Sequence, residues 1–128
     1  MEKGIIVIAE DDPVLREIYH KKFSLNGYDI RTCKNGEEAI AAVQEKIPDI
    51  LILDINMPVM DGFEVLSRFP KDQRPFPVIM LTNFGNESNR KRGDELGADD
   101  YFIKSDMTIR KLMEMVESLM TAKKYFKK

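Results

Sequence analysis

Short, wholly apolar runs alternate along this chain with longer stretches in which apolar residues recur at helical spacing. The first run covers residues 5–9 and reads Ile-Ile-Val-Ile-Ala. An unbroken apolar run rich in β-branched residues is typical of a strand that is covered on both faces of a sheet. The pattern predicts five strands, over residues 5–9, 28–33, 49–54, 78–81 and 101–103.

Polar residues mark where the first three intervening helices begin. Asp12 can cap a helix, and Pro13 suits the first turn because the amide hydrogen that proline lacks would be unpaired there. Asn35 can cap the second helix. Asp61 and Glu64 can form a capping box for a short third helix. Two more helices are predicted, over residues 87–96 and from residue 108 onward.

The last two predicted helices differ in their apolar content. From residue 108 onward, apolar side chains form a continuous amphipathic stripe. Residues 86–95 contain no apolar side chain, and Gly93 costs about 1 kcal/mol relative to alanine inside a helix. Because most helical stability comes from burying an apolar face, we expect the helix over 87–96 to be short, poorly packed and the most mobile of the five.

Strands that alternate with helices predict an α/β fold, in which helices cover both faces of a parallel sheet. The 128 residues contain no internal repeat and no low-complexity linker. We therefore expect a single domain over residues 1–128, with its core at about residues 4–122 and a short basic tail. With 43% apolar and 33% charged residues, the composition is that of an ordinary globular domain.

Charge and cysteine content exclude several classes of function. The net charge of -2 argues against non-specific nucleic-acid binding, which needs a basic surface. The single cysteine, Cys33, excludes an intramolecular disulfide and a multi-cysteine zinc site. The apolar run over residues 5–9 is far shorter than the roughly 20 residues of a membrane-spanning helix. We expect a cytoplasmic protein that binds neither nucleic acid nor membrane directly.

Acidic, hydroxyl and basic residues stand at the ends of the predicted strands. Glu10 and Asp11 follow the first strand, Asp54 closes the third, and Thr82 and Lys104 follow the fourth and fifth. These strand ends meet at one edge of a parallel sheet, where ligands bind. Clustered carboxylates without histidine or cysteine favour Mg²⁺, for which Mn²⁺ can substitute, and an aspartate can form an aspartyl phosphate. The set predicts metal-assisted phosphoryl transfer onto Asp54.

Taken one at a time, some of these residues have plainer interpretations. The acids at 10–12 could be only a helix-capping run. Thr82 could be an ordinary β-branched residue at a strand end. Tyr101, on the predicted fifth strand, fits a half-buried strand aromatic. The interpretation of the acids as metal ligands is favoured, because Asp54 and Lys104 stand at the same ends of two other predicted strands.

Several segments resemble the receiver domain of bacterial two-component response regulators, over essentially the whole chain. The most specific is Asp-Ile-Asn-Met-Pro-Val-Met-Asp-Gly at residues 54–62. The resemblance implies a flavodoxin-like, doubly wound fold with five helices and a five-stranded parallel sheet of order 2-1-3-4-5. It also implies that Asp54 accepts a phosphoryl group from a phosphohistidine of a sensor histidine kinase or phosphotransfer protein. The other matching segments are residues 10–13, 81–82, 96–101 and 103–104.

The resemblance also implies a role for each site residue. Mg²⁺ is held directly by two aspartates and one backbone carbonyl, and Glu10 acts through a metal-bound water. The face formed by the fourth helix, fifth strand and fifth helix binds an output partner. The implied metal ligands are Glu10, Asp11, Asp54 and Asn56, the phosphoryl-binding residues are Thr82 and Lys104, and the switch residues are Thr82 and Tyr101.

Two residues depart from the family pattern. Ser105 follows Lys104 where the family often has proline, and Asn83 follows Thr82 where the family often has a smaller residue.

Three functions fit the chain. The leading function is a phosphorylation-activated signalling switch, which catalyses only its own phosphorylation and dephosphorylation. The alternatives are a Mg²⁺-dependent phosphatase with an aspartyl-phosphate intermediate and a phosphorylation-independent adaptor of the same fold.

Overall fold

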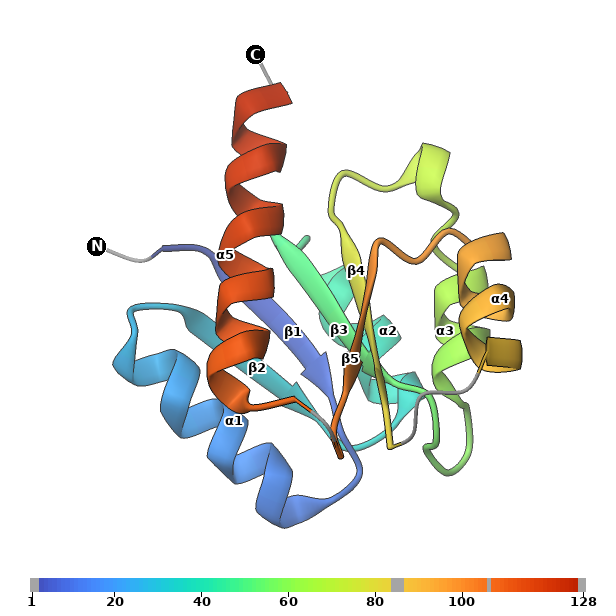
Figure 1. The fold of residues 1–128 in the computed structure, drawn as a ribbon, viewed down its shortest axis with the longest axis horizontal. Helices are drawn as coiled ribbons and strands as arrows, with labels where there is room; N and C mark the ends of the chain where they lie inside the picture. The colour runs from blue at the N-terminus through green and yellow to red at the C-terminus, as the bar shows by residue number, and fades with distance from the viewer. Residues whose placement is uncertain (1–2, 84–86, 106, 127–128) are drawn as a thin grey trace.

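A computed structural model describes residues 3–83, 87–105 and 107–126 of the chain. Its five strands all pair in parallel, in the order β2-β1-β3-β4-β5 (Figure 1). This is the order expected of the flavodoxin-like fold, so the predicted topology is confirmed. The strands are β1 (Ile5–Ala9), β2 (Asp29–Cys33), β3 (Ile50–Asp54), β4 (Val78–Thr82) and β5 (Asp100–Ile103).

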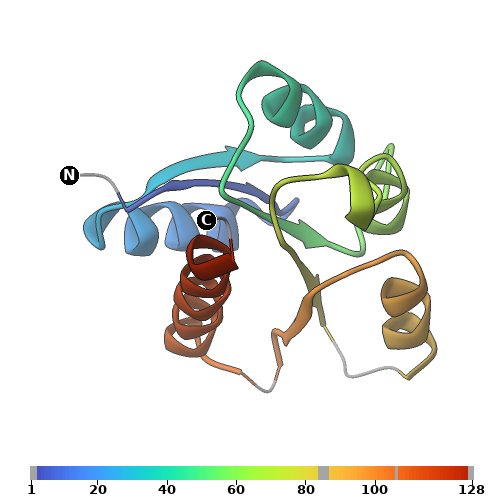
Figure 2. The same cartoon turned by 90° about the horizontal axis from the view of Figure 1, so that it is seen from above.

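Helices cover both faces of the sheet. Figure 2 shows α1 and α5 on one face and α2, α3 and α4 on the other. A short 3-10 helix, Lys71–Gln73, lies in the connection between α3 and β4. Within the described part of the chain, no helix is long and apolar enough to cross a membrane. The helices are α1 (Pro13–Leu25), α2 (Gly36–Glu45), α3 (Gly62–Ser67), α4 (Glu87–Glu95) and α5 (Ile109–Phe126).

Side-chain caps start the first three helices where the sequence predicted them. Asp12 accepts a hydrogen bond from the amide of Val14 at 2.9 Å. Asn35 caps α2 through the amide of Glu38 at 2.9 Å, and Asp61 caps α3 at the same distance. Asp12 and Asn35 lie three and two residues after a strand end, so these two loops are short, whereas Asp61 lies seven residues after the end of β3.

Two apolar cores lie on opposite faces of the sheet. Val7, Leu51 and Met80 are fully buried toward α2 and α3. Ile8 and Ile52 are fully buried toward α1 and α5. Residues of β3 and β4 are buried throughout, which explains why these strands are continuous apolar runs rather than alternating ones.

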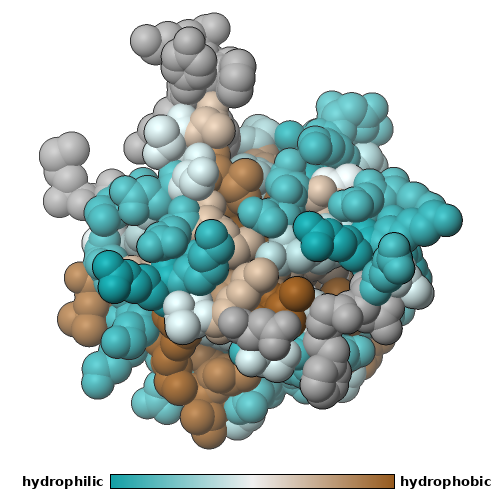
Figure 3. All heavy atoms as spheres, in the orientation of Figure 1, coloured by the Kyte–Doolittle hydropathy of each residue, from teal (hydrophilic) through white to brown (hydrophobic). Residues whose placement is uncertain are grey.

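The helix α4 is packed differently from the others. Among residues 87–95, Gly93 alone is buried, and Figure 3 shows a hydrophilic surface over α4. This agrees with the predicted lack of apolar packing, although α3 is shorter, with six residues against nine. The helix ends at Glu95, Gly97 follows it with a φ of +93°, and the amide of Ala98 donates to the carbonyl of Gly93. Its greater mobility stays a prediction.

Candidate functional site

Three carboxylates meet at the carboxyl edge of the sheet, the lower edge in Figure 1. Glu10 and Asp11 directly follow β1, and Asp54 is the last residue of the neighbouring strand β3. One oxygen of each lies within 4.8 Å of the others. Glu10 is fully buried, Asp54 is 2% exposed, and Asp11 faces solvent. The structure thus brings together the three acids that the sequence pattern pointed to.

Lys104 bridges the two buried carboxylates. Its Nζ lies 2.7 Å from Oε1 of Glu10 and 2.9 Å from Oδ2 of Asp54. Burial lowers the pKa of Lys104, but hydrogen bonds and charges from Glu10 and Asp54 outweigh it and raise that pKa. Burial raises the pKa of Glu10, and the hydrogen bond and negative charge of Asp54 raise it further. Lys104 supplies one positive charge to a cluster of three carboxylates and forms ion pairs with two of them, Glu10 and Asp54, so the cluster carries an excess of negative charge that a cation would neutralise.

The chemistry of the donors fits Mg²⁺. The cluster offers carboxylate oxygens from Glu10, Asp11 and Asp54, with no histidine or cysteine among its described members. Hard divalent ions with oxygen ligands prefer such a set. Asn56 lies against it, because its amide donates to Oδ1 of Asp54 at 3.1 Å. That the Asn56 carbonyl is a ligand stays a prediction.

Gly62 brings the start of α3 close to Asp54. A Cβ at Gly62 would overlap the carbonyl oxygen of Asp54 and lie 3.0 Å from its carbonyl carbon. The amide of Gly62 donates to the carbonyl of Ile55 at 3.0 Å, which closes the loop after β3. A side chain at position 62 would therefore push the loop away from the acidic cluster.

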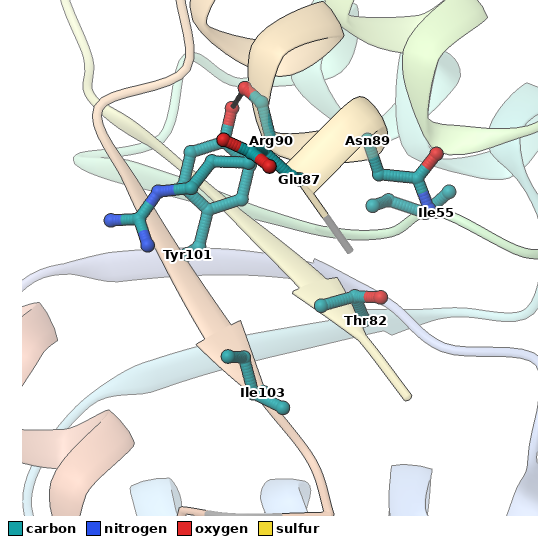
Figure 4. Close-up of a pocket in the computed structure, with 7 residues that line it drawn as sticks. All are labelled: Ile55, Thr82, Glu87, Asn89, Arg90, Tyr101 and Ile103. Carbon is teal, nitrogen blue, oxygen red and sulfur yellow. Dashed lines mark hydrogen bonds between the residues drawn. The ribbon is translucent and has the colours of Figure 1, made fainter. Parts of the chain in front are cut away.

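Thr82 and Tyr101 lie beside a cavity of about 310 Å³ between α4 and the last two strands. Thr82 is 6% exposed at the end of β4, and Tyr101 is 7% exposed on β5. The hydroxyl of Tyr101 donates to the carbonyl of Arg90 on α4 at 2.7 Å, the dashed line in Figure 4. The Arg90 guanidinium lies 5.3 Å from the centre of the tyrosine ring. Tyr101 is therefore turned inward and joined to α4; whether it moves stays a prediction.

One residue that contacts the acidic loop was not expected from the sequence. Arg16, on α1, donates from Nη1 to the carbonyl of Glu10 at 2.9 Å and to that of Asp11 at 3.3 Å. The signal that could have found it is spacing. Arg16 is the fourth residue of α1, and it lies six and five positions after the two residues whose carbonyls it binds.

The two departures from the family pattern both lie at the edge of the site. Asn83 and Ser105 are exposed and directly follow Thr82 and Lys104. No peptide bond in the described part of the chain is cis, so the bond between Lys104 and Ser105 is trans. Asn83 is thus exposed directly after β4, and its effect on phosphoryl chemistry stays a prediction.

Comparison with known proteins identifies the family of this site. A family model described as the response regulator receiver domain matches residues 6–117. The chain is 41% identical over 102 residues to a probable transcriptional regulator ycf27 of Guillardia theta, which covers 80% of this chain and 40% of that protein. It is 37% identical over 118 residues to the phosphate regulon transcriptional regulatory protein PhoB of Rhizobium meliloti, which covers 90% and 51%. The chain spans about half or less of these relatives.

Solved structures of receiver domains have the same fold. The receiver domain of the Francisella response regulator 1452 has a TM-score of 0.86 and 28% identity, covering 94% of this chain and 98% of that chain. The signal receiver domain of a signal transduction histidine kinase from Syntrophus aciditrophicus has a TM-score of 0.82 and 32% identity, covering 93% and 91%. The match over residues 6–117 and these likenesses show that the chain belongs to the response regulator receiver domains, the family of phosphorylation-activated switches of two-component signalling.

Proposed function

We propose that Asp54 accepts a phosphoryl group from a phosphohistidine of a sensor kinase or phosphotransfer protein. The observation that carries this proposal is the position of Asp54. Its Oδ2 is 2.9 Å from the ammonium of Lys104, inside a cluster of three carboxylates at the end of β3. An aspartate so placed has a cationic partner for the incoming phosphoryl group and oxygen neighbours that can share a metal ion.

The transfer exchanges one bond to phosphorus for another. A carboxylate oxygen of Asp54 attacks phosphorus while the bond from phosphorus to the histidine nitrogen breaks, and the electrons of that bond return to the imidazole. Lys104 is already beside Asp54 and offers a positive charge to a phosphoryl oxygen. The hydroxyl of Thr82 offers a hydrogen-bond donor. The protein thus contributes positioning and electrostatic stabilisation.

The metal residues act together with this pair. Asp11, Asp54 and the carbonyl of Asn56 are the proposed direct ligands of Mg²⁺, and Glu10 is proposed to act through a water molecule. When bound, Mg²⁺ supplies positive charge that offsets the charge on the phosphoryl oxygens. Mn²⁺ is expected to substitute, because it prefers the same oxygen ligands.

The switch is proposed to run from Thr82 to Tyr101 and α4. A contact between Thr82 and the phosphoryl group would change the wall of the 310 Å³ cavity on which Tyr101 also lies. Tyr101 is bonded to Arg90, so its position is coupled to that of α4. An output protein that binds one arrangement of α4, β5 and α5 better than another would then respond to phosphorylation.

The family favours a switch over the phosphatase and adaptor alternatives. The names of the curated relatives describe transcriptional regulators about twice as long as this chain or more. The expectation of no direct contact with nucleic acid therefore concerns these 128 residues alone.

The test of the proposal is phosphoryl uptake from a small phosphodonor such as acetyl phosphate, followed by intact-protein mass spectrometry. We expect one phosphoryl group per chain with Mg²⁺ present and none after chelation. Asp54→Asn should take up none. Asp61→Asn is the matched control, because asparagine also caps helices and α3 should remain intact. Equal uptake by Asp54→Asn and the wild type would contradict the proposal.

A further inference from the structure

We infer that Arg16 is a positioning residue of the metal site, an inference that rests on the proposed function. Its Nη1 bonds the carbonyls of two successive residues, Glu10 at 2.9 Å and Asp11 at 3.3 Å. These two residues supply two of the three carboxylates in the acidic cluster. One guanidinium nitrogen thus holds the peptide groups that follow Glu10 and Asp11, and so limits the directions that the two acidic side chains can take.

The need for such a contact differs between the two acids. The side chain of Glu10 is held by other groups: Oε1 binds Lys104 at 2.7 Å, and Oε2 accepts from the amide of Asp12 at 3.2 Å. Within the described residues, no hydrogen bond or ion pair involves the Asp11 carboxylate, and Asp11 is exposed. Its direction is therefore set by the backbone, and Arg16 is the described side chain that bonds its carbonyl.

The helix α1 makes Arg16 a rigid support. Asp12 caps this helix through the amide of Val14 at 2.9 Å, and the amide of Arg16 donates to the carbonyl of Asp12 at 2.9 Å. The guanidinium therefore reaches back from an anchored turn to the loop that holds the acids. Removing it leaves the carbonyls of Glu10 and Asp11 without this partner and frees the loop to sample other directions.

Arg16 could also act through its charge, and that effect has the opposite sign. A nearby positive charge opposes cation binding, so its removal would tighten Mg²⁺ binding. Arg16 is half-exposed, and solvent and salt screen the charge of such a group. Loss of a residue that orients metal ligands typically weakens metal affinity about 10- to 100-fold. We therefore expect the positioning effect to exceed the charge effect.

The experiment is a calorimetric titration of Mg²⁺, repeated with Mn²⁺, into the full chain and its variants at a temperature where all are folded. Arg16→Gln should bind about 10-fold more weakly than the wild type. Arg16→Lys should lie between the two, because an ammonium can reach one carbonyl but lacks the planar fork of arginine. Lys21→Gln is the matched control: it removes one positive charge from an exposed position on the same helix and should leave affinity unchanged.

The outcomes separate this inference from the proposed function. If the wild type binds Mg²⁺, Asp11→Asn does not, and Arg16→Gln binds as the wild type or more tightly, Arg16 is not a positioning residue. If the wild type itself does not bind Mg²⁺, the proposed function and this inference both fail. Should Arg16→Gln not fold, unchanged affinity in Arg16→Lys overturns the inference. Amide NMR shifts at residues 10–12 in metal-free Arg16→Lys, in addition to those next to position 16, support it.

Discussion

The contact between Tyr101 and Gly93 gives the sharpest prediction about the output face. Because α4 has no apolar stripe, it is held by polar and aromatic contacts, and Tyr101 makes two of them with Arg90. A Cβ at Gly93 would overlap the Tyr101 hydroxyl and lie 2.8 Å from the ring carbon that carries it. Gly93→Ala should therefore displace Tyr101 from α4.

The size of the effect follows from the contacts that would be lost. The hydrogen bond to the Arg90 carbonyl contributes about 1 kcal/mol. The guanidinium over the ring adds about 0.5–1 kcal/mol, and burial of the Tyr101 ring adds up to about 2 kcal/mol. Alanine favours the helix by about 1 kcal/mol relative to glycine. We expect Gly93→Ala to lower the free energy of unfolding by about 2 kcal/mol.

The assay is urea denaturation of a double-mutant cycle with Tyr101→Ala. Without the tyrosine there is nothing for the new methyl group to displace, so Gly93→Ala should then stabilise the domain by about 1 kcal/mol. The sign of the effect should reverse between the two backgrounds, with a coupling energy of about 3 kcal/mol. Ser88→Ala, at an exposed position of α4, should have the same small effect in both. An equal effect of Gly93→Ala in both backgrounds would refute the reasoning.

Three further predictions concern stability and kinetics. Arg74 is 2% exposed, lies 2.8 Å from Asp99 and donates to the carbonyls of Phe69 and Phe76, so Arg74→Met should cost about 3 kcal/mol in urea denaturation by removing these buried contacts, although Lys71 still lies 3.3 Å from Asp99; a change below about 1 kcal/mol would contradict this. Burial raises the pKa of Glu10 in the metal-free fold above its ordinary value of 4.5. The stability that the neutral Glu10 carboxyl contributes is therefore fully present below pH 4.5 and is lost as pH rises through the raised pKa. Glu10→Gln should abolish that fall in the free energy of unfolding, and an identical pH profile would exclude Glu10 as its source. Asn83→Ala should speed phosphorylation, dephosphorylation or both in a stopped-flow assay with a small phosphodonor, and unchanged rates would show that Asn83 does not shield the site.

Sequence patterns predicted the features that depend on local order along the chain. The run Ile50–Asp54 is buried on both faces and could be recognised as a strand without knowing its neighbours. Asp12, Asn35 and Asp61 cap helices because the cap and the amides it binds are adjacent in sequence. Asp54 and Lys104 were expected together, because parallel strands bring their carboxyl ends to one edge.

Side-chain contacts that depend on the loops between the elements could not be predicted in this way. Arg74 and Asp99 are 25 positions apart, and nothing in either segment indicates the other. No residue in the middle of α4 was expected to pack against the sheet. In the structure, the Arg90 guanidinium lies over the Tyr101 ring, and the Arg92 guanidinium lies 4.4 Å from the centre of the Phe63 ring. Such contacts depend on how the connecting loops place the elements, which local propensity does not encode.

The central claim is that Asp54 is the phosphoacceptor, and chemical trapping tests it most directly. The chain is incubated with Mg²⁺ and acetyl phosphate and then reduced with borohydride, which converts an aspartyl phosphate into homoserine. Peptide mass spectrometry then locates the converted residue. We predict homoserine at position 54 alone, absent from the Asp54→Asn variant and from samples with chelator. Homoserine at another acid, such as Asp11 or Asp61, with none at position 54, would contradict the account.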